Sequence, residues 1–224
     1  MKRLILIGNP NVGKSAVFSR LTGIHATTSN YPGTTVAYKS GLSKVDGEQF
    51  EVIDTPGAYS LECTNEAEKV AVDLLDTGDI IVNVVDSTNL ERNLMLTMQL
   101  LERGLPVILC CNMFDDAEHK GIRLDLQALR DFLRVPVIPT VGISGKGVKD
   151  LAQTIADYSR RVDAGEEFPA IHEHSRSEKW VDIGQIIDEV QSLEHRHHTL
   201  AEWLQDMSVH PVSGIPFAAA VLTV

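Results

Sequence analysis

The stretch Gly8-Asn9-Pro10-Asn11-Val12-Gly13-Lys14-Ser15 follows directly on an apolar run at residues 4–7. The spacing G-x-x-x-x-G-K-S is typical of a loop that binds phosphate between a strand and a helix. Its glycines let backbone N–H groups turn inward, and the following helix adds the positive end of its dipole. A turn without a ligand is the alternative, and the apolar run before the loop and the helix-forming residues 16–21 after it argue against that. The residues expected around the phosphates are Gly8, Asn9, Pro10, Asn11, Val12, Gly13, Lys14, Ser15 and Ala16.

Three side chains and one backbone group near this loop are expected to serve phosphate and metal. Lys14 would place its charge on the β- and γ-phosphates of a nucleoside triphosphate, and the Ser15 hydroxyl would ligate Mg²⁺. The motif Asp54-Thr55-Pro56-Gly57 ends a strand expected at 49–53. Asp54 would hold the Mg²⁺ shell through water, and the Gly57 N–H would contact the γ-phosphate. The segment after Gly57 should then respond to hydrolysis, and a Pro-Gly type II turn is compatible with that role.

A switch is expected at Asn30-Tyr31-Pro32-Gly33-Thr34-Thr35-Val36, because this stretch is polar and carries Pro and Gly. One of Thr34 and Thr35, with Thr35 favoured, would ligate Mg²⁺ only when GTP is present. The order of the motifs supports this interpretation. An ordinary surface-loop threonine is the alternative.

The motif Asn112-Met113-Phe114-Asp115, which follows the apolar run 106–111, is expected to select the base of the bound nucleotide. A carboxylate can accept hydrogen bonds from N1–H and N2–H₂ of guanine, whereas adenine would leave it unpaired. Alone, N-x-x-D is more often a loop cap. Placed after a phosphate loop and a D-x-x-G motif, it predicts GTP rather than ATP, with Asn112, Met113 and Asp115 at the base.

Periodicity predicts an α/β fold. The expected strands are 2–7, 36–45, 49–53, 80–85, 106–111 and 135–141, with 36–45 and 49–53 joined as an antiparallel pair through Asp46-Gly47. The expected helices are 14–21, 66–76, 90–103, 124–133 and 148–161. Continuous apolar strands need a sheet covered on both faces. The result is a mostly parallel six-stranded sheet with one antiparallel strand, with the ligand loops at the carboxyl ends of its strands.

Composition narrows the class of protein. The chain has 224 residues, 43% of them hydrophobic, and a net charge of −11. It can bury a core, and its acidity argues against a broad nucleic-acid-binding surface. Cys63, Cys110 and Cys111 show no C-x-x-C spacing, which favours reduced thiols in the cytosol, and no signal peptide is recognised.

Together these motifs resemble the translation-factor-like branch of small GTPases, and more narrowly the N-terminal G domain of the bacterial ferrous iron transport protein B (FeoB) family. The resemblance is carried by residues 8–15, 31–36, 54–57 and 112–115 and by the tail His210-Pro211-Val212-Ser213-Gly214-Ile215-Pro216. It covers residues 1 to about 160 and the last fifteen. It implies a Ras-like P-loop GTPase fold that hydrolyses GTP to GDP and phosphate, on the cytoplasmic face of the bacterial inner membrane.

The family also implies partners and a domain order. Switch regions would couple the nucleotide state to the transmembrane part of the same transporter and to small cytosolic accessory proteins; nucleic acid is not expected, and a homo-oligomer is left open. The expected order is a G domain (1–162), a linker (163–177), a short all-α region (178–209) with helices at 178–195 and 199–207, and a tail (210–224). The ten-residue apolar segment 215–224 is half of a bilayer span. The tail therefore reads as the start of a transmembrane segment or as an exposed end.

Two departures from the family pattern concern the site. Tyr31 stands where the family usually has Trp, which keeps an aromatic anchor for the switch. The fifth guanine loop normally reads Ser-Ala-x, and alignment places Gly142, Ile143 and Ser144 there, with Ser144-Gly145-Lys146 as the alternative register. A backbone N–H, that of Ile143, is expected to reach the guanine O6.

The catalytic expectation rests on Asn11, Lys14, Thr35 and Gly57. Ala58 follows Gly57, so the water-orienting Gln of Ras-like enzymes is absent and intrinsic hydrolysis should be slow. By resemblance to potassium-activated relatives, Asn11 would ligate a K⁺ ion that replaces an arginine finger, with carbonyls near residues 29–31 completing the site. The alternative for Asn11 is a turn residue that tolerates unusual backbone angles.

Three further interpretations stay open. His172, His174, His195, His197 and His198 invite an iron site, although solvated histidines are favoured because no acidic or Cys ligands accompany them. A soluble GTPase of the ribosome-assembly or tRNA-modification kind would need an RNA-binding module. A nucleotide-dependent binding switch would show negligible turnover.

Overall fold

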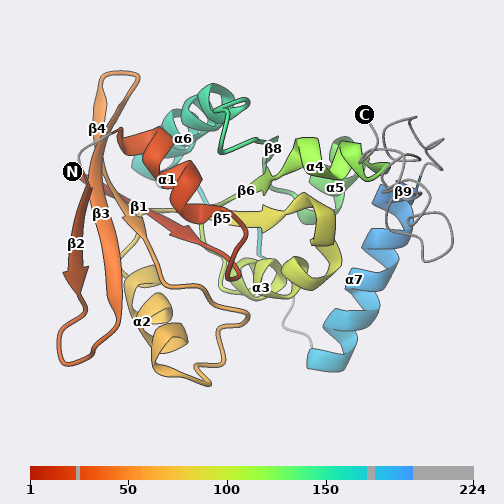
Figure 1. Ribbon diagram of the computed structural model, residues 1–224, viewed down its shortest axis with the longest axis horizontal. Coiled ribbons are helices and arrows are strands. Elements are labelled where there is room, and N and C mark those ends of the chain that lie inside the picture. Colours follow the sequence, from red (N-terminus) through yellow and green to blue (C-terminus); the bar gives the residue numbers. More distant parts are fainter. Residues whose placement is uncertain (24–25, 171–174, 194–224) are drawn as a thin grey trace, which may run out of the picture. The chain divides into compact units, whose positions relative to one another are not determined.

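The structure is a computed structural model that describes residues 1–23, 26–170 and 175–193 (Figure 1). One compact unit spans Met1–Ser192, and a second spans Leu193–Val224. The five histidines of the iron hypothesis, the expected helix 199–207 and the tail 210–224 all lie outside the described residues.

A seven-stranded sheet organises the unit of residues 1–192, with strand order β2-β3-β4-β1-β5-β6-β8. Strand β3 runs antiparallel to both β2 and β4, and the remaining pairs are parallel. The expected mostly parallel sheet with one antiparallel strand is confirmed. Its extra strand is β2, which lies at the edge. The strands are β1 (Lys2–Ile7), β2 (Ala26–Asn30), β3 (Ala37–Val45), β4 (Glu48–Asp54), β5 (Ile80–Asp86), β6 (Val107–Asn112) and β8 (Val137–Pro139).

Helices cover both faces of the sheet because the central strands are apolar on both sides. Leu4 and Leu6 of β1 face a core shared with α1 (Lys14–Thr22) and α6 (Val148–Asp163). Ile5 and Ile7 face the opposite core, shared with α2 (Glu66–Leu75), α3 (Leu90–Glu102) and α5 (Leu126–Leu133). This alternation along β1 follows from the period of two in a strand.

Several boundaries differ from the sequence expectations for local reasons. The helix expected from 124 begins at Leu126, because the Asp125 side chain accepts hydrogen bonds from the N–H groups of Gln127 and Ala128. Residues 122–124 form the short strand β7 (Ile122–Leu124) instead. The strand expected at 135–141 is only three residues long, and Val141 pairs with Lys146 across the next loop. Short helices η1 (Ser87–Asn89) and α4 (Phe114–His119) add to the expected set.

The last described helix, α7 (Arg176–Val190), begins with a capping box between Ser175 and Glu178. It ends at Val190, where the sequence pattern predicted 195, because the chain continues as β9 (Gln191–Leu193), which pairs with β7. Ile183 and Ile186 are buried in the same core as α3 and α5. Lys179 forms an ion pair with Glu102 of α3 at 2.7 Å, and both side chains are 10% exposed. The first half of the expected all-α region therefore packs within the unit of residues 1–192.

Among the described residues, none of the helices has the length and apolar character needed to cross a membrane.

Candidate nucleotide-binding site

Four loops that the sequence singled out meet at one edge of the sheet. They follow β1, β4, β6 and β8, whose carboxyl ends point the same way because these strands are parallel. Open α/β sheets bind ligands at this edge. Hydrogen bonds tie the loops to one another.

The phosphate loop needs its two glycines where the structure brings other groups too close for a side chain. A Cβ on Gly8 would lie 2.1 Å from the Val84 carbonyl oxygen. Gly13 has a φ of 84°, and a Cβ there would lie 2.3 Å from Nδ2 of Asn112. Both positions therefore require glycine: tight packing excludes a side chain at each, and Gly13 also adopts a left-handed backbone conformation.

Lys14 is buried, and its ammonium group lies within the loop that it follows. Its Nζ donates to the carbonyl oxygens of Gly8, at 3.1 Å, and Asn9, at 3.2 Å. Burial lowers the pKa of Lys14, while the nearby Asp54 carboxylate acts in the opposite direction. A phosphate group here would offer the ammonium a negatively charged acceptor in place of neutral carbonyl oxygens.

Ser15 and Asp54 lie together, as the metal expectation requires. The Ser15 hydroxyl donates to Oδ2 of Asp54 at 2.7 Å. The other carboxylate oxygen, Oδ1, is buried and has no hydrogen-bond partner in the structure. Burial raises the pKa of Asp54, and the Ser15 hydrogen bond and the Lys14 charge partly offset that shift. A hydroxyl beside a carboxylate with an unused oxygen is an oxygen-rich donor set that fits Mg²⁺.

The segment after Asp54 packs directly on the phosphate loop. The Ala58 N–H donates to the Gly8 carbonyl at 3.1 Å, and a Cβ on Gly57 would lie 2.8 to 3.0 Å from atoms of Pro10. Ala58 is fully buried and offers no group that could orient water. Gly57 is thereby held beside the phosphate loop with no room for a side chain.

Residues 59–65 are held by side chains of α2 and α3 that sequence reasoning missed. Glu68 accepts from the N–H groups of Tyr59, at 3.3 Å, and Thr64, at 2.9 Å. Gln99 accepts from the Leu61 N–H at 2.8 Å, and the Arg92 guanidinium lies 4.8 Å from the centre of the Tyr59 ring. Gln99 lies 38 residues from Leu61, so no local motif indicates that contact, whereas Glu68 lies only four and nine residues from Thr64 and Tyr59.

The expected switch threonines occupy different environments. The Thr34 hydroxyl donates to the Tyr31 carbonyl and accepts from the Val36 N–H, which closes a tight turn. Thr35, the next residue, is exposed. The expected switch begins at Asn30, which is the last residue of strand β2, and β2 pairs with β3.

Asn112 joins three parts of the site from its position at the end of β6. Its Nδ2 donates to the Val12 carbonyl at 2.9 Å, and its Oδ1 accepts from the Gly142 N–H at 2.8 Å. The residue is 2% exposed. Asp115, in the first turn of α4, stays half-buried on the same loop. Asn112 therefore ties the loops together, and Asp115 lies beside them.

The loop of residues 142–146 lies against α1 and the phosphate loop. A Cβ on Gly142 would lie 3.1 Å from Cβ of Ala16. Arg20 of α1 donates through Nε to the Gly142 carbonyl, at 3.1 Å, and through a terminal nitrogen to the Ile143 carbonyl. Arg20 was missed in the sequence because its partners are 122 and 123 residues away.

Asn11 is exposed and has a φ of 65°. This left-handed conformation agrees with the turn-forming interpretation of an asparagine at this position. It is also compatible with a side-chain oxygen that serves a cation. Within the described part of the chain, no cluster of three or more His, Cys, Asp and Glu side chains could hold a metal ion.

Comparison with known proteins agrees with this geometry. The sequence model of the family "Ferrous iron transport protein B" matches residues 2–155. The chain is 46% identical over 156 residues to a Fe(2+) transport protein A/Fe(2+) transporter FeoB fusion protein of Porphyromonas gingivalis, a match that covers 68% of this chain and 18% of that protein. It is 42% identical over 180 residues to the Fe(2+) transporter FeoB of Escherichia coli K12, covering 77% and 23%. The chain thus spans about a fifth of the length of these relatives.

Solved structures give the same result. The cytosolic domain of L. pneumophila FeoB superposes with a TM-score of 0.76 at 29% identity, over 85% of this chain and 99% of that one. The cytosolic domain of T. maritima FeoB, in a GDP form, superposes with a TM-score of 0.73 at 32% identity, over 84% and 74%. Its GMPPNP form has a TM-score of 0.73 at 29% identity, over 96% and 84%.

Proposed function

Because this chain belongs to the ferrous iron transport protein B family, we propose that it is the GTP-binding and GTP-hydrolysing domain of a ferrous iron membrane transporter. The observation that carries the proposal is the convergence of the phosphate loop, the Asp54 motif, the Asn112 motif and the 142–146 loop at one sheet edge, joined by hydrogen bonds. The similar cytosolic domain of T. maritima FeoB has been solved in GDP and GMPPNP forms, which supports a guanine nucleotide as the ligand here.

The residues would divide the work as follows. Backbone N–H groups of residues 8–16 and the Lys14 ammonium hold the phosphates. Asp115 selects guanine through its N1–H and N2–H₂ edge. Ser15, Asp54 and, in the GTP state, Thr35 would hold Mg²⁺, which supplies positive charge to the phosphate oxygens when bound. The Gly57 N–H would contact the γ-phosphate. Loss of the γ-phosphate on hydrolysis would then free the segment that follows Gly57.

Hydrolysis needs positive charge where the β–γ bond breaks, and residue 58 provides no side chain to orient the water. We assign the charge to K⁺ held by Asn11 and by carbonyls near residues 29–31. The support is the exposed Asn11 side chain at the turn of the phosphate loop.

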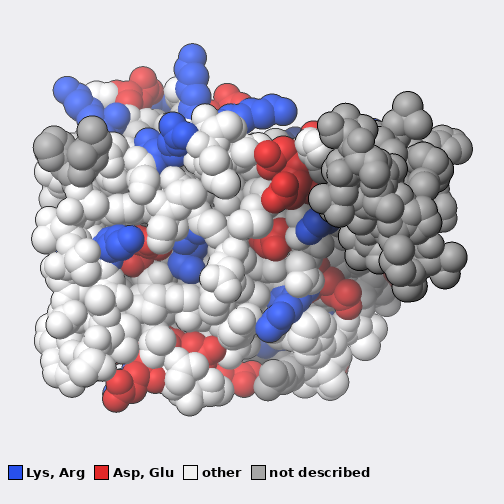
Figure 2. Space-filling model, viewed as in Figure 1, with Lys and Arg blue, Asp and Glu red and all other residues white. Residues whose placement is uncertain are grey.

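The remaining parts of the proposal concern the cell. The transporter's transmembrane part and an accessory protein would bind the switch segments in a way that depends on the bound nucleotide, on the cytoplasmic face of the inner membrane. A relative that joins a Fe(2+) transport protein A part to its FeoB part supports such an accessory partner. Nucleic acid is not assigned as a partner, because the net charge is −11 and, on the face shown in Figure 2, Lys and Arg are interspersed with Asp and Glu.

The experiment compares GTP and ATP hydrolysis in KCl, NaCl and LiCl. The proposal predicts that GTP is hydrolysed faster in KCl than in NaCl or LiCl, that ATP is not hydrolysed, and that Asn11→Ala abolishes the difference. Asn89→Ala, at another exposed asparagine, serves as the control and should keep the potassium response. Tight GTP binding without detectable hydrolysis in KCl would favour a binding switch instead.

A further inference from the structure

We propose that Arg20 is a positioning residue for the guanine base: it orients the peptide groups of residues 142–144 so that their N–H groups face the nucleotide, and it thereby slows nucleotide release. This inference rests on the proposed guanine-nucleotide function. It assigns a role to a side chain on α1 that lies outside the phosphate, Asp54 and Asn112 motifs.

The contact is a fork between one guanidinium group and two neighbouring carbonyls. Nε of Arg20 donates to the Gly142 oxygen at 3.1 Å, and a terminal nitrogen donates to the Ile143 oxygen. Gly145 lies against the same side chain, since a Cβ there would be 3.5 to 3.6 Å from the guanidinium and Cδ atoms. The planar guanidinium donates in two fixed directions, which a lysine ammonium cannot reproduce.

The direction of the N–H groups follows from peptide geometry. In a trans peptide the C=O of one residue and the N–H of the next lie in one plane and point in opposite directions. Since Arg20 binds the carbonyls of residues 142 and 143, it fixes the planes that carry the N–H groups of Ile143 and Ser144. These N–H groups then point away from Arg20, and the Ile143 N–H is the one expected to reach the guanine O6.

Contacts inside the loop and contacts from its neighbours hold it together: the Gly145 N–H donates to the Val141 carbonyl at 2.7 Å, and the Ser144 hydroxyl donates to the same oxygen at 3.4 Å. Arg20 adds side-chain hydrogen bonds to the carbonyls of residues 142 and 143. The Gly142 N–H donates to Oδ1 of Asn112 at 2.8 Å, so the Asn112 side chain fixes the peptide group between residues 141 and 142. Ile143 is 85% exposed, and its side chain contributes little packing. The loop reads Gly-Ile-Ser where the family pattern has Ser-Ala-x, and Arg20 of the neighbouring helix adds support to the contacts within the loop.

The test measures the dissociation rate of a fluorescent GDP analogue in Mg²⁺ buffer. Arg20→Ala should speed release about ten-fold, the factor that corresponds to about 1.4 kcal/mol. Arg20→Lys should give an intermediate rate, and Arg20→Gln a rate near that of Arg20→Ala. The control is Arg160→Ala, which removes another exposed arginine, one paired with Asp46 and Asp157 on the surface, and should release GDP at the wild-type rate.

A second nucleotide separates positioning from general weakening. The diphosphate of 6-thioguanosine keeps the N1–H and N2–H₂ groups that pair with Asp115 but carries sulfur, a weak acceptor, in place of O6. The inference predicts that Arg20→Ala and Arg20→Gln speed the release of GDP far more than that of this analogue. Wild-type release of GDP by the Arg20 variants, or an equal acceleration for both nucleotides, would overturn it. Failure of the wild-type protein to bind GDP at all would instead overturn the proposed function.

Discussion

Replacing Asn112 by alanine should damage both the fold and the nucleotide site, because one buried amide serves three groups. Its Nδ2 donates to the Val12 carbonyl at 2.9 Å, while its Oδ1 accepts from the Gly142 N–H at 2.8 Å and from the Thr140 hydroxyl at 3.3 Å. Alanine removes all three bonds. It leaves a carbonyl of the phosphate loop and an N–H of the 142–146 loop buried without a partner.

The magnitude follows from the cost of burying an unsatisfied polar group, about 1–3 kcal/mol each. Two such backbone groups give a loss of about 2–4 kcal/mol in the free energy of unfolding, after some relaxation and entry of water. In a domain of this size that loss lowers the melting temperature by about 5–15 °C. Circular dichroism on heating measures the shift, and calorimetry with GDP measures the accompanying loss of affinity.

The matched control is Asn89→Ala, which changes an exposed asparagine whose side chain makes no capping bond to α3. Its melting temperature should stay within about 2 °C of wild type, as for surface substitutions in general. If Asn112→Ala melted with the control and bound GDP as the wild type does, the three hydrogen bonds would not be holding the site together.

Three further predictions concern thiols, glycines and one carboxylate. Of the three cysteines, only Cys63 is exposed, and burial raises the pKa of Cys110 to about 12. A thiol reagent should therefore modify one cysteine in the native protein and three in denaturant, and rapid modification of all three before unfolding would refute this. Gly8→Ala should lower the free energy of unfolding, measured in denaturant, by about 2 kcal/mol or more, because the added Cβ would collide with the Val84 carbonyl. Gly184→Ala on α7 has open space around the added Cβ and should raise the free energy of unfolding by about 0.5–1 kcal/mol. The opposite order would contradict the packing argument. Burial raises the pKa of Asp54 above 3.8, so the ligand-free native state loses stability as the pH rises from about 4 through that raised pKa. Asp54→Asn should therefore be more stable than wild type at pH 8 and lose this advantage below pH 4. An advantage that does not change with pH would show that the ionisation of Asp54 is not its cause.

Much of the fold was predictable because the central strands are apolar. The strands β1, β5 and β6 lie within a residue of their predicted limits, since each is buried on both faces and flanked by turn residues. The phosphate loop was predictable for the same kind of reason, because glycine at positions 8 and 13 is required by a close approach that the motif encodes. The family assignment, made from these motifs, is confirmed by the comparison with known proteins.

Edge and long-range features could not be predicted from local pattern. Strand β2 reads Ala-Thr-Thr-Ser-Asn and is almost wholly exposed, so it shows no alternation of apolar and polar residues. It exists because β3 offers a backbone partner. Arg20 and Gln99 act across 122 and 38 residues, and nothing near either residue in the sequence indicates its partner.

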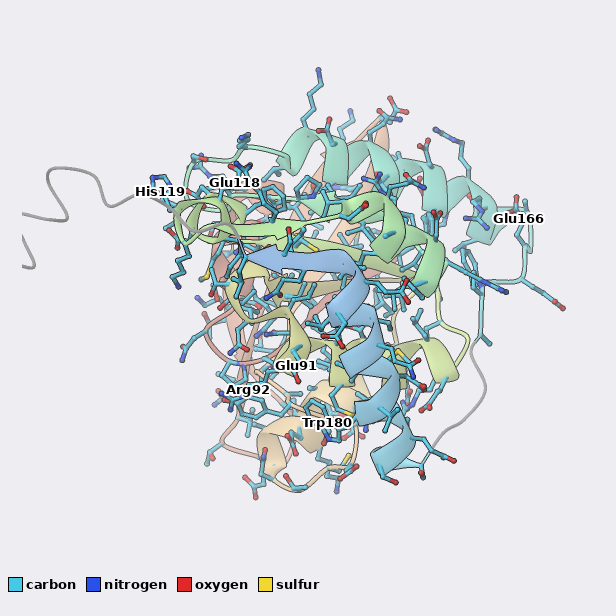
Figure 3. The ribbon with its side chains drawn as sticks, turned by 90° about the vertical axis from the view of Figure 1, so that its right-hand side faces the viewer. Glu91, Arg92, Glu118, His119, Glu166 and Trp180 are labelled. Atoms are coloured by element: carbon cyan, nitrogen blue, oxygen red, sulfur yellow. The ribbon has the colours of Figure 1, made fainter. Side chains whose placement is uncertain are left out.

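Figure 3 shows another long-range arrangement, with Trp180 on α7 and Arg92 at the start of α3 on the same side of the molecule. Together with Tyr59 and Met95, they line a pocket of about 340 Å³ beside residues 59–65. A helix that the sequence assigned to a separate region thus lies next to the segment that should respond to hydrolysis. Only tertiary packing reveals this arrangement.

The most direct test of the central claim is titration calorimetry of the protein with GDP and with ADP in Mg²⁺ buffer. The account predicts saturable binding of one GDP per chain and no binding of ADP, because Asp115 pairs with guanine and the loops joined by Asn112 hold its phosphates. Absence of heat with GDP, or equal affinity for ADP, would contradict it.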